Sequence, residues 1–300
     1  MARSLTQITD LTAAEVMEVF DLCGKMKRGE IAPKPLAGKS VACVFTKQSL
    51  RTRVSFEVGI NQLGGQALYI TDGEIQLGKR ETVADAARVL SRYIHMIMIR
   101  TYKQSDVEEL AKYATVPVIN GLTDAVHPCQ ILGDYFTAIE HKPAQKKYKI
   151  AYLGDGNNIT HSWLNLASLI PIDLRIATAA DCKPEQLYVD RALKNPNSSV
   201  LLTEDPKAAV AGADVIYTDV WASMGQKHLA EQKEEKLRGF QVNSSLLKGA
   251  DPKAIVMHCL PAERGKEITD EVMDGPQSVV FDQAENRLHI QKAIMVFLLK

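Results

Sequence analysis

The segment from Ser40 to Arg53 has the sequence SVACVFTKQSLRTR and passes from an apolar run into a polar, cationic one. Its first part, Ser40–Phe45, is rich in apolar and β-branched side chains, which predicts a buried strand. Ser49 is a favourable helix N-cap, so we expect a helix over residues 51–63. A strand, a short polar loop and a helix together form the beginning of a βαβ unit.

The same alternation continues along the chain, after an opening helix that we expect Asp10 to cap. Further strands are expected at 66–70, 96–100, 116–119, 148–153, 174–178, 199–203, 214–218, 254–258 and 278–281, and further helices at 82–93, 105–113 and 128–140. Strands that are separated by helices of this length indicate parallel sheets.

A polar segment, His141–Lys147, interrupts the alternation near the middle of the chain. We therefore expect an α/β protein of two doubly wound domains, residues 1–140 and 141–283. Each would have a central parallel sheet flanked by helices, and the active site would lie in the cleft between them. The last helix, 284–300, is apolar and is expected to pack back on the first domain.

The composition excludes several classes of protein. Lysine plus arginine and aspartate plus glutamate each number 36, so the formal net charge is zero and an anion site must be local. We expect no nucleic-acid or membrane partner. The longest apolar run, Ala293–Leu299, is far shorter than the ~20 residues that span a bilayer. The N-terminus has no secretory pattern, so a cytoplasmic location is expected. The five cysteines are irregularly spaced, which indicates no disulfide framework and no metal site.

The start of the expected helix at 51–63 carries three cations, Lys47, Arg51 and Arg53. The helix dipole disfavours positive charge at a helix N-terminus, whereas a bound anion reverses that cost. Arginine side chains also bind phosphate through two parallel hydrogen bonds. The segment therefore favours a phosphate site, and a solvated basic helix start is the alternative.

A second constellation is His127-Pro128-Cys129-Gln130. Pro128 fits the first position of a helix, and Gln130 fits half of a capping box, which is a purely structural role. Alternatively, His127 and Gln130 point from the helix start into the cleft and hold a polarised carbonyl and an amide. Both interpretations remain open at this level.

Two further segments follow expected strands: Asp219–Gly225, with the sequence DVWASMG, and His258-Cys259-Leu260-Pro261. Ligands of parallel sheets gather beyond the carboxyl ends of strands, and an acid, a hydroxyl and a glycine there suit an amino acid. A turn and a helix cap explain Asp219–Gly225 equally well. His258 and Cys259 are adjacent, so strand geometry points them to opposite sides and excludes a nucleophilic pair. Cys259 contacts a ligand or is a buried small hydrophobe.

The segment LGDGNN at 153–158 resembles the start of a dinucleotide fingerprint. However, Ile159 occupies the position of the third glycine, and Asp181 lies past the spacing of a ribose-binding acid. We therefore reject a nicotinamide-dependent oxidoreductase and expect no cofactor.

In this order, the segments at 49–53, 127–130, 219–225 and 258–261 resemble the aspartate/ornithine carbamoyltransferase family, and its ornithine branch in particular. The segments at 87–90, 154–158 and 284–287 also fit. The resemblance implies transfer of a carbamoyl group from carbamoyl phosphate to the side-chain amine of L-ornithine, giving L-citrulline and phosphate. It further implies a role in arginine biosynthesis, without deciding against arginine breakdown, and a homotrimer or an assembly of trimers.

The resemblance also implies the roles of individual residues. Carbamoyl phosphate would be held by Ser49, Leu50, Arg51, Thr52, Arg100, His127, Gln130, Cys259, Leu260 and Arg287, with Gln76 reaching in from a neighbouring subunit. Ornithine would be held by Asn158, Asp219, Ser223 and Met224. The catalytic residues would be Arg51, Arg100, His127, Asp219 and Cys259. The neutral amine would attack the carbonyl carbon, and Arg51, Arg100 and His127 would clamp the tetrahedral oxyanion.

The chain departs from the family pattern at Leu50, where many relatives have threonine, at Thr46 in the same loop, and at Glu263, where histidine is common. Loops with the Leu50 pattern also occur in the branch that acts on acylated ornithine. Three alternatives therefore stay open: an acylated ornithine acceptor, putrescine as acceptor, and a non-catalytic ligand-binding relative. We expect the departures to tune affinity without abolishing activity.

Overall fold

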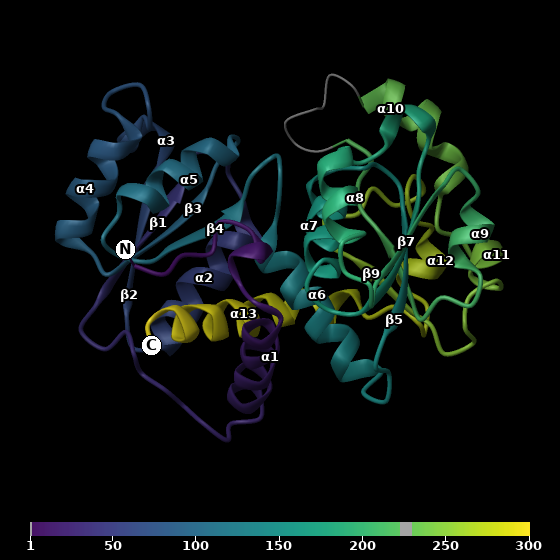
Figure 1. The fold of residues 1–300 in the computed structure, drawn as a ribbon, viewed down its shortest axis with the longest axis horizontal. Coiled ribbons are helices and arrows are strands. Elements are labelled where there is room, and N and C mark those ends of the chain that lie inside the picture. Colours follow the sequence, from purple (N-terminus) through teal and green to yellow (C-terminus); the bar gives the residue numbers. More distant parts are fainter. Residues whose placement is uncertain (1, 223–229) are drawn as a thin grey trace. The chain divides into compact units, whose positions relative to one another are not determined.

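The computed structural model describes residues 2–222 and 230–300, and the chain divides into two compact units. Unit 1 comprises Met1–Gly133 and Asn286–Lys300, and unit 2 comprises Asp134–Glu285. The divisions fall within two helices, α6 (Pro128–His141) and α13 (Val280–Leu298). Each unit contains a parallel sheet flanked by helices, which confirms the predicted fold class (Figure 1). No helix of the described residues has the length and apolar character needed to cross a membrane.

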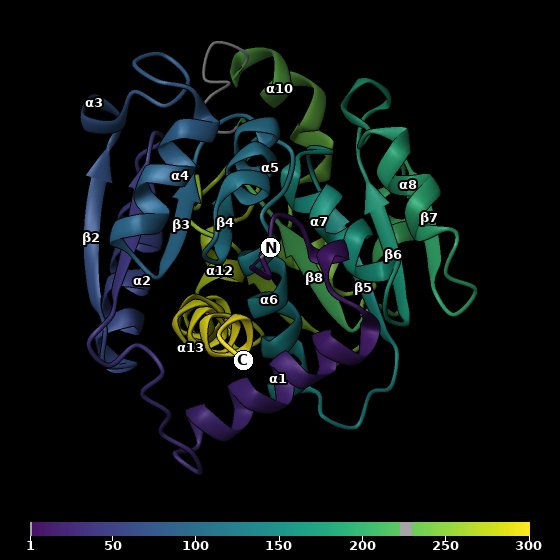
Figure 2. The ribbon, with the colours of Figure 1, turned by 60° about the vertical axis from the view of Figure 1, so that its left-hand side comes forward.

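Unit 1 is built on a four-stranded parallel sheet of order β2-β1-β3-β4. Its strands are β1 (Ser40–Phe45), β2 (Gln66–Thr71), β3 (Met96–Arg100) and β4 (Val118–Leu122), and its other helices are η1 (Ile8–Asp10), α1 (Ala13–Lys27), α2 (Leu50–Gln62), α3 (Asp72–Ile75), α4 (Val83–Tyr93) and α5 (Gln104–Tyr113). Alternate strand residues, such as Val44 and Ile99, pack on Ala87 of α4 and Leu110 of α5. Figure 2 shows these two helices together on one side of the sheet.

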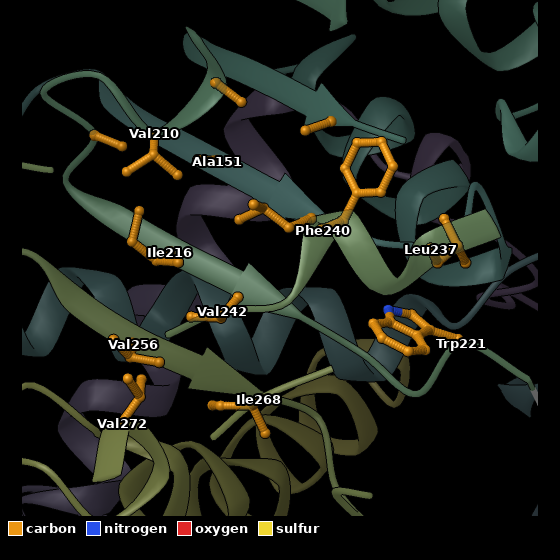
Figure 3. Packing of buried hydrophobic residues seen from close by; sticks show 14 of the residues in the cluster. Ala151, Val210, Ile216, Trp221, Leu237, Phe240, Val242, Val256, Ile268 and Val272 are labelled. Atoms are coloured by element: carbon orange, nitrogen blue, oxygen red, sulfur yellow. The ribbon is translucent and has the colours of Figure 1, made fainter. Parts of the chain in front are cut away.

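Unit 2 is built on a five-stranded parallel sheet of order β7-β6-β5-β8-β9. Its strands are β5 (Tyr148–Leu153), β6 (Ile172–Ala177), β7 (Ser199–Thr203), β8 (Val215–Thr218) and β9 (Ile255–His258), and its other helices are α7 (Asn158–Ala167), η2 (Ala180–Cys182), α8 (Gln186–Ala192), α9 (Pro206–Val210), α10 (Ala230–Leu237), η4 (Arg238–Phe240), α11 (Ser244–Leu247) and α12 (Asp270–Met273). On one face, Ile216 and Val256 pack in a buried cluster with Trp221, Leu237 and Phe240 (Figure 3).

The order of the strands decides where a ligand can bind. The chain reverses its direction of winding between β1 and β3 in unit 1, and between β5 and β8 in unit 2. Helices leave opposite faces of the sheet at such a point, so the loops beyond the carboxyl ends of these strands bound a crevice. Thr46 and Arg100 are at that edge of unit 1, and Gly154 and Asp219 are at that edge of unit 2.

Several local expectations were wrong or displaced, and β6, expected at 174–178, covers Ile172–Ala177. Thr12, and not Asp10, caps α1, through a capping box with Glu15. The strand expected at 116–119 begins at Val118, because Pro117 has no N–H to give to the ladder. No strand covers 278–281: Ser278 makes only an isolated bridge to β9, and α13 begins at Val280.

The loop that resembles a dinucleotide fingerprint is closed by the chain itself. Gly156 donates its N–H to the carbonyl oxygen of Cys182 at 2.7 Å. A Cβ on Gly156 would lie 2.2 Å from the nitrogen of Pro184 and 2.4 Å from the oxygen of Cys182. Backbone therefore occupies the space into which a pyrophosphate would approach a true fingerprint.

We predict that Gly156→Ala destabilises the protein by about 1–3 kcal/mol or more, because backbone atoms of the loop at Gly156 or of the segment 182–184 would have to move. Urea unfolding followed by circular dichroism measures this change. Gly239→Ala is the matched control, because a Cβ at Gly239 meets no atom within 4 Å, and it should change stability by less than about 0.5 kcal/mol. Equal stability of the two variants would show that the loop yields to the extra methyl group.

Candidate active site

The loop after β1 ends in a capped helix. Ser49 has extended backbone, and its hydroxyl accepts a hydrogen bond from the N–H of Thr52 at 3.3 Å, which confirms the predicted N-cap of α2. The N–H groups of the first helical turn therefore face the carboxyl edge of the sheet, where an anion can accept from them. Arg51 lies in this turn with an exposed side chain and has no hydrogen-bond or ion-pair partner in the described part of the chain.

The three cations of this loop have different surroundings. The Lys47 side chain is buried, its ammonium lies 2.7 Å from Asp124, and it stands over the ring of Tyr102. Arg53 instead turns outward, pairs with Glu57 at 2.8 Å and stacks on the ring of Tyr69. Arg53 is therefore engaged at the surface, whereas Lys47 is buried and Arg51 is exposed at the start of α2.

Two arginines converge on Thr52. The Nη1 of Arg100, at the end of β3, donates to the Oγ1 of Thr52 at 3.1 Å, and the Nη2 of Arg287, on α13, donates to the same oxygen at 2.8 Å. All three residues are buried. Two guanidinium groups that share one neutral acceptor repel each other, and a doubly charged anion placed between them would relieve this repulsion.

His127 immediately precedes α6, and Pro128 holds the first helical position as predicted. Burial lowers the pKa of His127 well below its usual value, and the charges of Arg287, Arg100 and Lys47 lower it further. His127 is therefore a neutral imidazole. Gln130 lies buried in the first turn of α6, three residues after His127. A neutral imidazole can donate one N–H to a carbonyl oxygen without adding charge.

The side chains at the positions that depart from the family pattern are exposed or only partly buried. Leu50 is the first residue of α2, and its side chain is 76% exposed, so any contact with a ligand would come from its backbone. The hydroxyl of Thr46 donates to that of Thr101 at 2.8 Å. The exposed side chain of Glu263 pairs with Lys266.

Gln76 has an unusual backbone conformation. It follows α3 with φ 43°, in the left-handed region that non-glycine residues rarely adopt. Its side chain is exposed, and among the described residues its amide reaches only the carbonyl oxygen of Gly73, at 3.5 Å. Backbone strain at an exposed polar residue is a feature of functional positions.

In unit 2, Asp219 and Cys259 follow the neighbouring strands β8 and β9 and meet. The thiol of Cys259 donates to the Oδ1 of Asp219 at 2.9 Å, and the side-chain amide of Asn157 donates to its Oδ2 at 3.0 Å. Burial raises the pKa of Cys259 well above its usual value, and the negative charge of Asp219 raises it further. Cys259 is therefore a neutral thiol and not a thiolate nucleophile.

His258 serves a different structure, as the strand geometry predicted. Its Nδ1 accepts from the N–H of Leu260 at 2.9 Å, so the proton is on Nε2, which lies 2.9 Å from the Oε1 of Glu267. Leu260 itself has φ 58°. His258 thus fixes the turn after Cys259 and makes no hydrogen bond with its thiol.

Asp219, His258 and Cys259 form a group whose potential metal-binding atoms lie within 4.8 Å of one another. Both ring nitrogens of His258 are already engaged, and Asp219 and Cys259 are hydrogen-bonded to each other. In the described part of the chain, this group is therefore better suited to hold an organic amine than a metal ion.

A hydrogen-bond network that the sequence did not suggest joins the strands that carry Asp219 and Cys259. Asp134 accepts from the hydroxyl of Tyr217 at 2.7 Å and from the amide of Gln283 at 2.8 Å, and Gln283 accepts from the N–H of His258 at 2.8 Å. Tyr217 is two residues before Asp219, and His258 is one before Cys259. The network therefore fixes the ends of the two strands that carry the acid and the thiol.

The predicted site residues thus form two sets. Unit 1 contains Ser49, Leu50, Arg51, Thr52, Arg100, His127, Gln130 and Arg287, and unit 2 contains Asn158, Asp219, Cys259 and Leu260. Hydrogen bonds join Thr52 with both arginines Arg100 and Arg287 in unit 1, and Cys259 with Asp219 in unit 2. Asn158 begins α7 with a buried side chain, and it is its neighbour Asn157 that contacts Asp219. Asn157 was not among the predicted site residues, although an asparagine directly before the helix α7 is a typical N-cap residue. Ser223 and Met224 lie outside the described residues.

Comparisons with known proteins agree with this arrangement. Residues 3–140 match the carbamoyl-P binding domain of aspartate/ornithine carbamoyltransferase, and residues 146–298 match its Asp/Orn binding domain. An ornithine carbamoyltransferase of Syntrophus aciditrophicus is 50% identical over the whole length of both chains. A solved structure of the ornithine carbamoyltransferase from Pyrococcus furiosus is 48% identical, with a TM-score of 0.93 over 99% of this chain and 96% of that one. A structure from Campylobacter jejuni, 34% identical, has a TM-score of 0.94 over 99% and 98%.

A buried cationic anion site and an acid–thiol pair, each at the carboxyl edge of a parallel sheet, are the parts that a group-transfer enzyme with an anionic donor and an amine acceptor requires. With both family models matched, the chain belongs to the aspartate/ornithine carbamoyltransferase family and is a carbamoyltransferase.

We predict that His127 is still neutral at pH 6.5, where an ordinary histidine is half protonated, because burial and the neighbouring cations lower its pKa well below that value. Nuclear magnetic resonance of 15N-labelled histidine, with the His127→Asn variant to assign the signal, measures the ring shifts directly. Protonation of His127 with a midpoint at or above pH 6.5 would contradict the electrostatics described for the arginine cluster.

Proposed function

We propose that the chain transfers the carbamoyl group of carbamoyl phosphate to the side-chain amine of L-ornithine, giving L-citrulline and phosphate. The observation that carries this proposal is the convergence of Arg100 and Arg287 on Thr52 at the capped start of α2. The names of the relatives support ornithine as the acceptor. A Pyrococcus furiosus relative named as anabolic, 49% identical, supports a role in arginine biosynthesis.

In this proposal unit 1 holds the donor. The phosphate accepts from the first-turn N–H groups of α2 and from Arg51, which is exposed and uncommitted in the described chain. Arg100 and Arg287 converge on Thr52, and their charges act on His127. Arg51, Arg100 and His127 would hold the carbonyl oxygen, where negative charge develops as the tetrahedral intermediate forms. Residues 1–140 are thus proposed as the carbamoyl-phosphate-binding domain, with the final helix added to it.

Unit 2, with residues 141–283 as its proposed domain, would hold the acceptor. Asp219 is an acid in hydrogen-bond contact with a neutral thiol, so it can accept from an ammonium or amine group. Because the pKa of Cys259 is raised, its thiol keeps its own proton and cannot accept another, as a thiolate could. Asn158, with Ser223 and Met224, is proposed to bind the α-amino and carboxylate end of ornithine.

The amine must lose a proton before it attacks. A lysine-like amine has a pKa of about 10.4, so its neutral form at pH 7 costs about 4.6 kcal/mol. Desolvation of the amine on entry into a buried site lowers its pKa and therefore lowers that cost. The reaction further requires that donor and acceptor sites serve one active site, since the amine nitrogen must reach van der Waals contact with the carbonyl carbon.

We predict citrulline formation from carbamoyl phosphate and ornithine, and little product with putrescine or N-acetylornithine as acceptor. A colorimetric assay for the ureido group measures all three reactions. Arg51→Ala should lower kcat/KM by at least about a hundredfold, because it removes a donor to the phosphate or oxyanion, with no loss of fold by circular dichroism. Turnover with another amine would replace the acceptor, and no turnover with any amine would favour a ligand-binding protein.

We also propose a homotrimer, or an assembly of trimers, in which Gln76 completes the site of a neighbouring subunit. The strained backbone and exposed side chain of Gln76 support this proposal, because neither is explained by a contact within the described chain. A head-to-tail contact of this kind closes into a ring when its rotation is threefold.

We predict that Gln76→Ala is nearly inactive alone, and that activity returns when it is refolded or co-expressed with the inactive Arg51→Ala variant. Random assortment of the two chains restores about a quarter of the sites, because a site needs its own Arg51 and the neighbour's Gln76. Ureido assays on the purified mixture, with light scattering for the molecular mass, measure both parts. Absence of complementation in a trimer of mixed chains would place Gln76 in the site of its own subunit.

A further inference from the structure

Lys233 of α10 forms an ion pair with Asp155 in the loop after β5. The Nζ of Lys233 lies 2.5 Å from the Oδ2 of Asp155, and the two side chains are only 15% and 8% exposed. Most other ion pairs of unit 2 are far more exposed, for example Lys236 with Asp181 on the same helix, at 46% and 72%. A pair that is largely shielded from water is screened little by salt, so its charges act on their surroundings.

Those surroundings are the acceptor site. The loop that carries Asp155 lies against Asp219: the side-chain amide of Asn157 donates to Asp219, and a Cβ on Gly154 would lie 3.8 Å from the Asp219 carbonyl oxygen. Burial raises the pKa of Asp155, the Lys233 ammonium opposes this effect, and the charge of Asp219 adds to it. Asp155 and Asp219 are therefore two acids that interact electrostatically, and Lys233 neutralises the first.

Helix α10 places this lysine by a small apolar anchor. Leu237, at its end, is buried in the cluster with Trp221, which follows Asp219 by two residues (Figure 3).

Asp155, Lys233 and Asp219 together carry a net charge of −1, whereas without Lys233 they would carry −2. Ornithine with both amines protonated has a net charge of +1, and a diamine such as putrescine has +2.

We propose that Lys233 is a specificity-determining residue, which neutralises Asp155 so that Asp219 is the one uncompensated acid of this group and the site matches an amino acid better than a diamine dication. This inference rests on the proposed function, because it assumes that the acceptor binds at Asp219. It adds a residue that acts through Asp155 and need not touch the substrate. Because the proposed effect depends on charge, removal of the Lys233 charge alone should lower the preference for an amino acid over a diamine. Removal of the Asp155 charge as well should restore that preference.

The test compares Lys233→Met, Asp155→Asn and the double variant, with ornithine and putrescine as acceptors at saturating carbamoyl phosphate. For Lys233→Met we expect the ratio of kcat/KM for ornithine over putrescine to fall about tenfold, which corresponds to about 1.4 kcal/mol. The KM for carbamoyl phosphate should stay within about twofold, since Lys233 belongs to unit 2. The double variant should recover the ratio to within about threefold of the parent.

Lys236→Met is the matched control, because it removes a lysine from an ion pair on the same helix at an exposed position, and it should leave the ratio unchanged. An unchanged ratio in Lys233→Met would overturn the proposal. A fall that the double variant does not reverse would also overturn it, and would make the pair a purely structural anchor of α10. Absence of turnover by the parent protein would instead reject the proposed function, so the two failures are distinguishable.

Discussion

The hydroxyl of Thr52 accepts hydrogen bonds from two buried arginines that lie on different elements, β3 and α13. Burial of cations is costly, and cations that share a neutral acceptor repel each other. Much of unit 1 serves to hold them there: a parallel sheet ends at Arg100, a capped helix begins beside it, and the C-terminal segment belongs to the same unit and supplies Arg287. Burial keeps His127 neutral, and the same cations further disfavour a positive charge on its ring.

The group around Asp219 in unit 2 has the opposite electrostatic character. Burial and the negative charge of Asp219 keep Cys259 protonated, and Glu267 and the N–H of Leu260 fix the tautomer of His258. These groups are oriented by the strands that carry them, and Asp134 ties the two strand ends together through Tyr217 and Gln283. A rigid set of hydrogen bonds of this kind holds a reacting group without changing its own charge, which is the form of preorganisation that transition-state stabilisation requires.

The elements of the fold were predicted more completely than the contacts within the site. The strands at 40–45, 96–100, 148–153 and 199–203 have the bounds that their apolar runs indicated, because burial in a sheet is written directly into local composition. Errors arose where local patterns were ambiguous: Asp10 and Thr12 are both good caps, and the apolar residues 278–281 suit a strand as well as a helix start. Arg53, one of the three cations between β1 and the first turns of α2, pairs with Glu57 and stacks on Tyr69, which spacing alone could not show.

By itself, the sequence determined that parallel sheets would form and which loops would lie at their carboxyl edges, because hydrophobic periodicity and helix caps act over a few neighbouring residues. Tertiary structure decided which side chains meet there. Thr52 and Arg287 are 235 residues apart in the chain, Asp155 and Lys233 are 78 apart, and Asp219 and Cys259 are 40 apart. The sequence contains many residues that could pair with each of these groups. Only the packing of strands and helices brings one of them within hydrogen-bond distance.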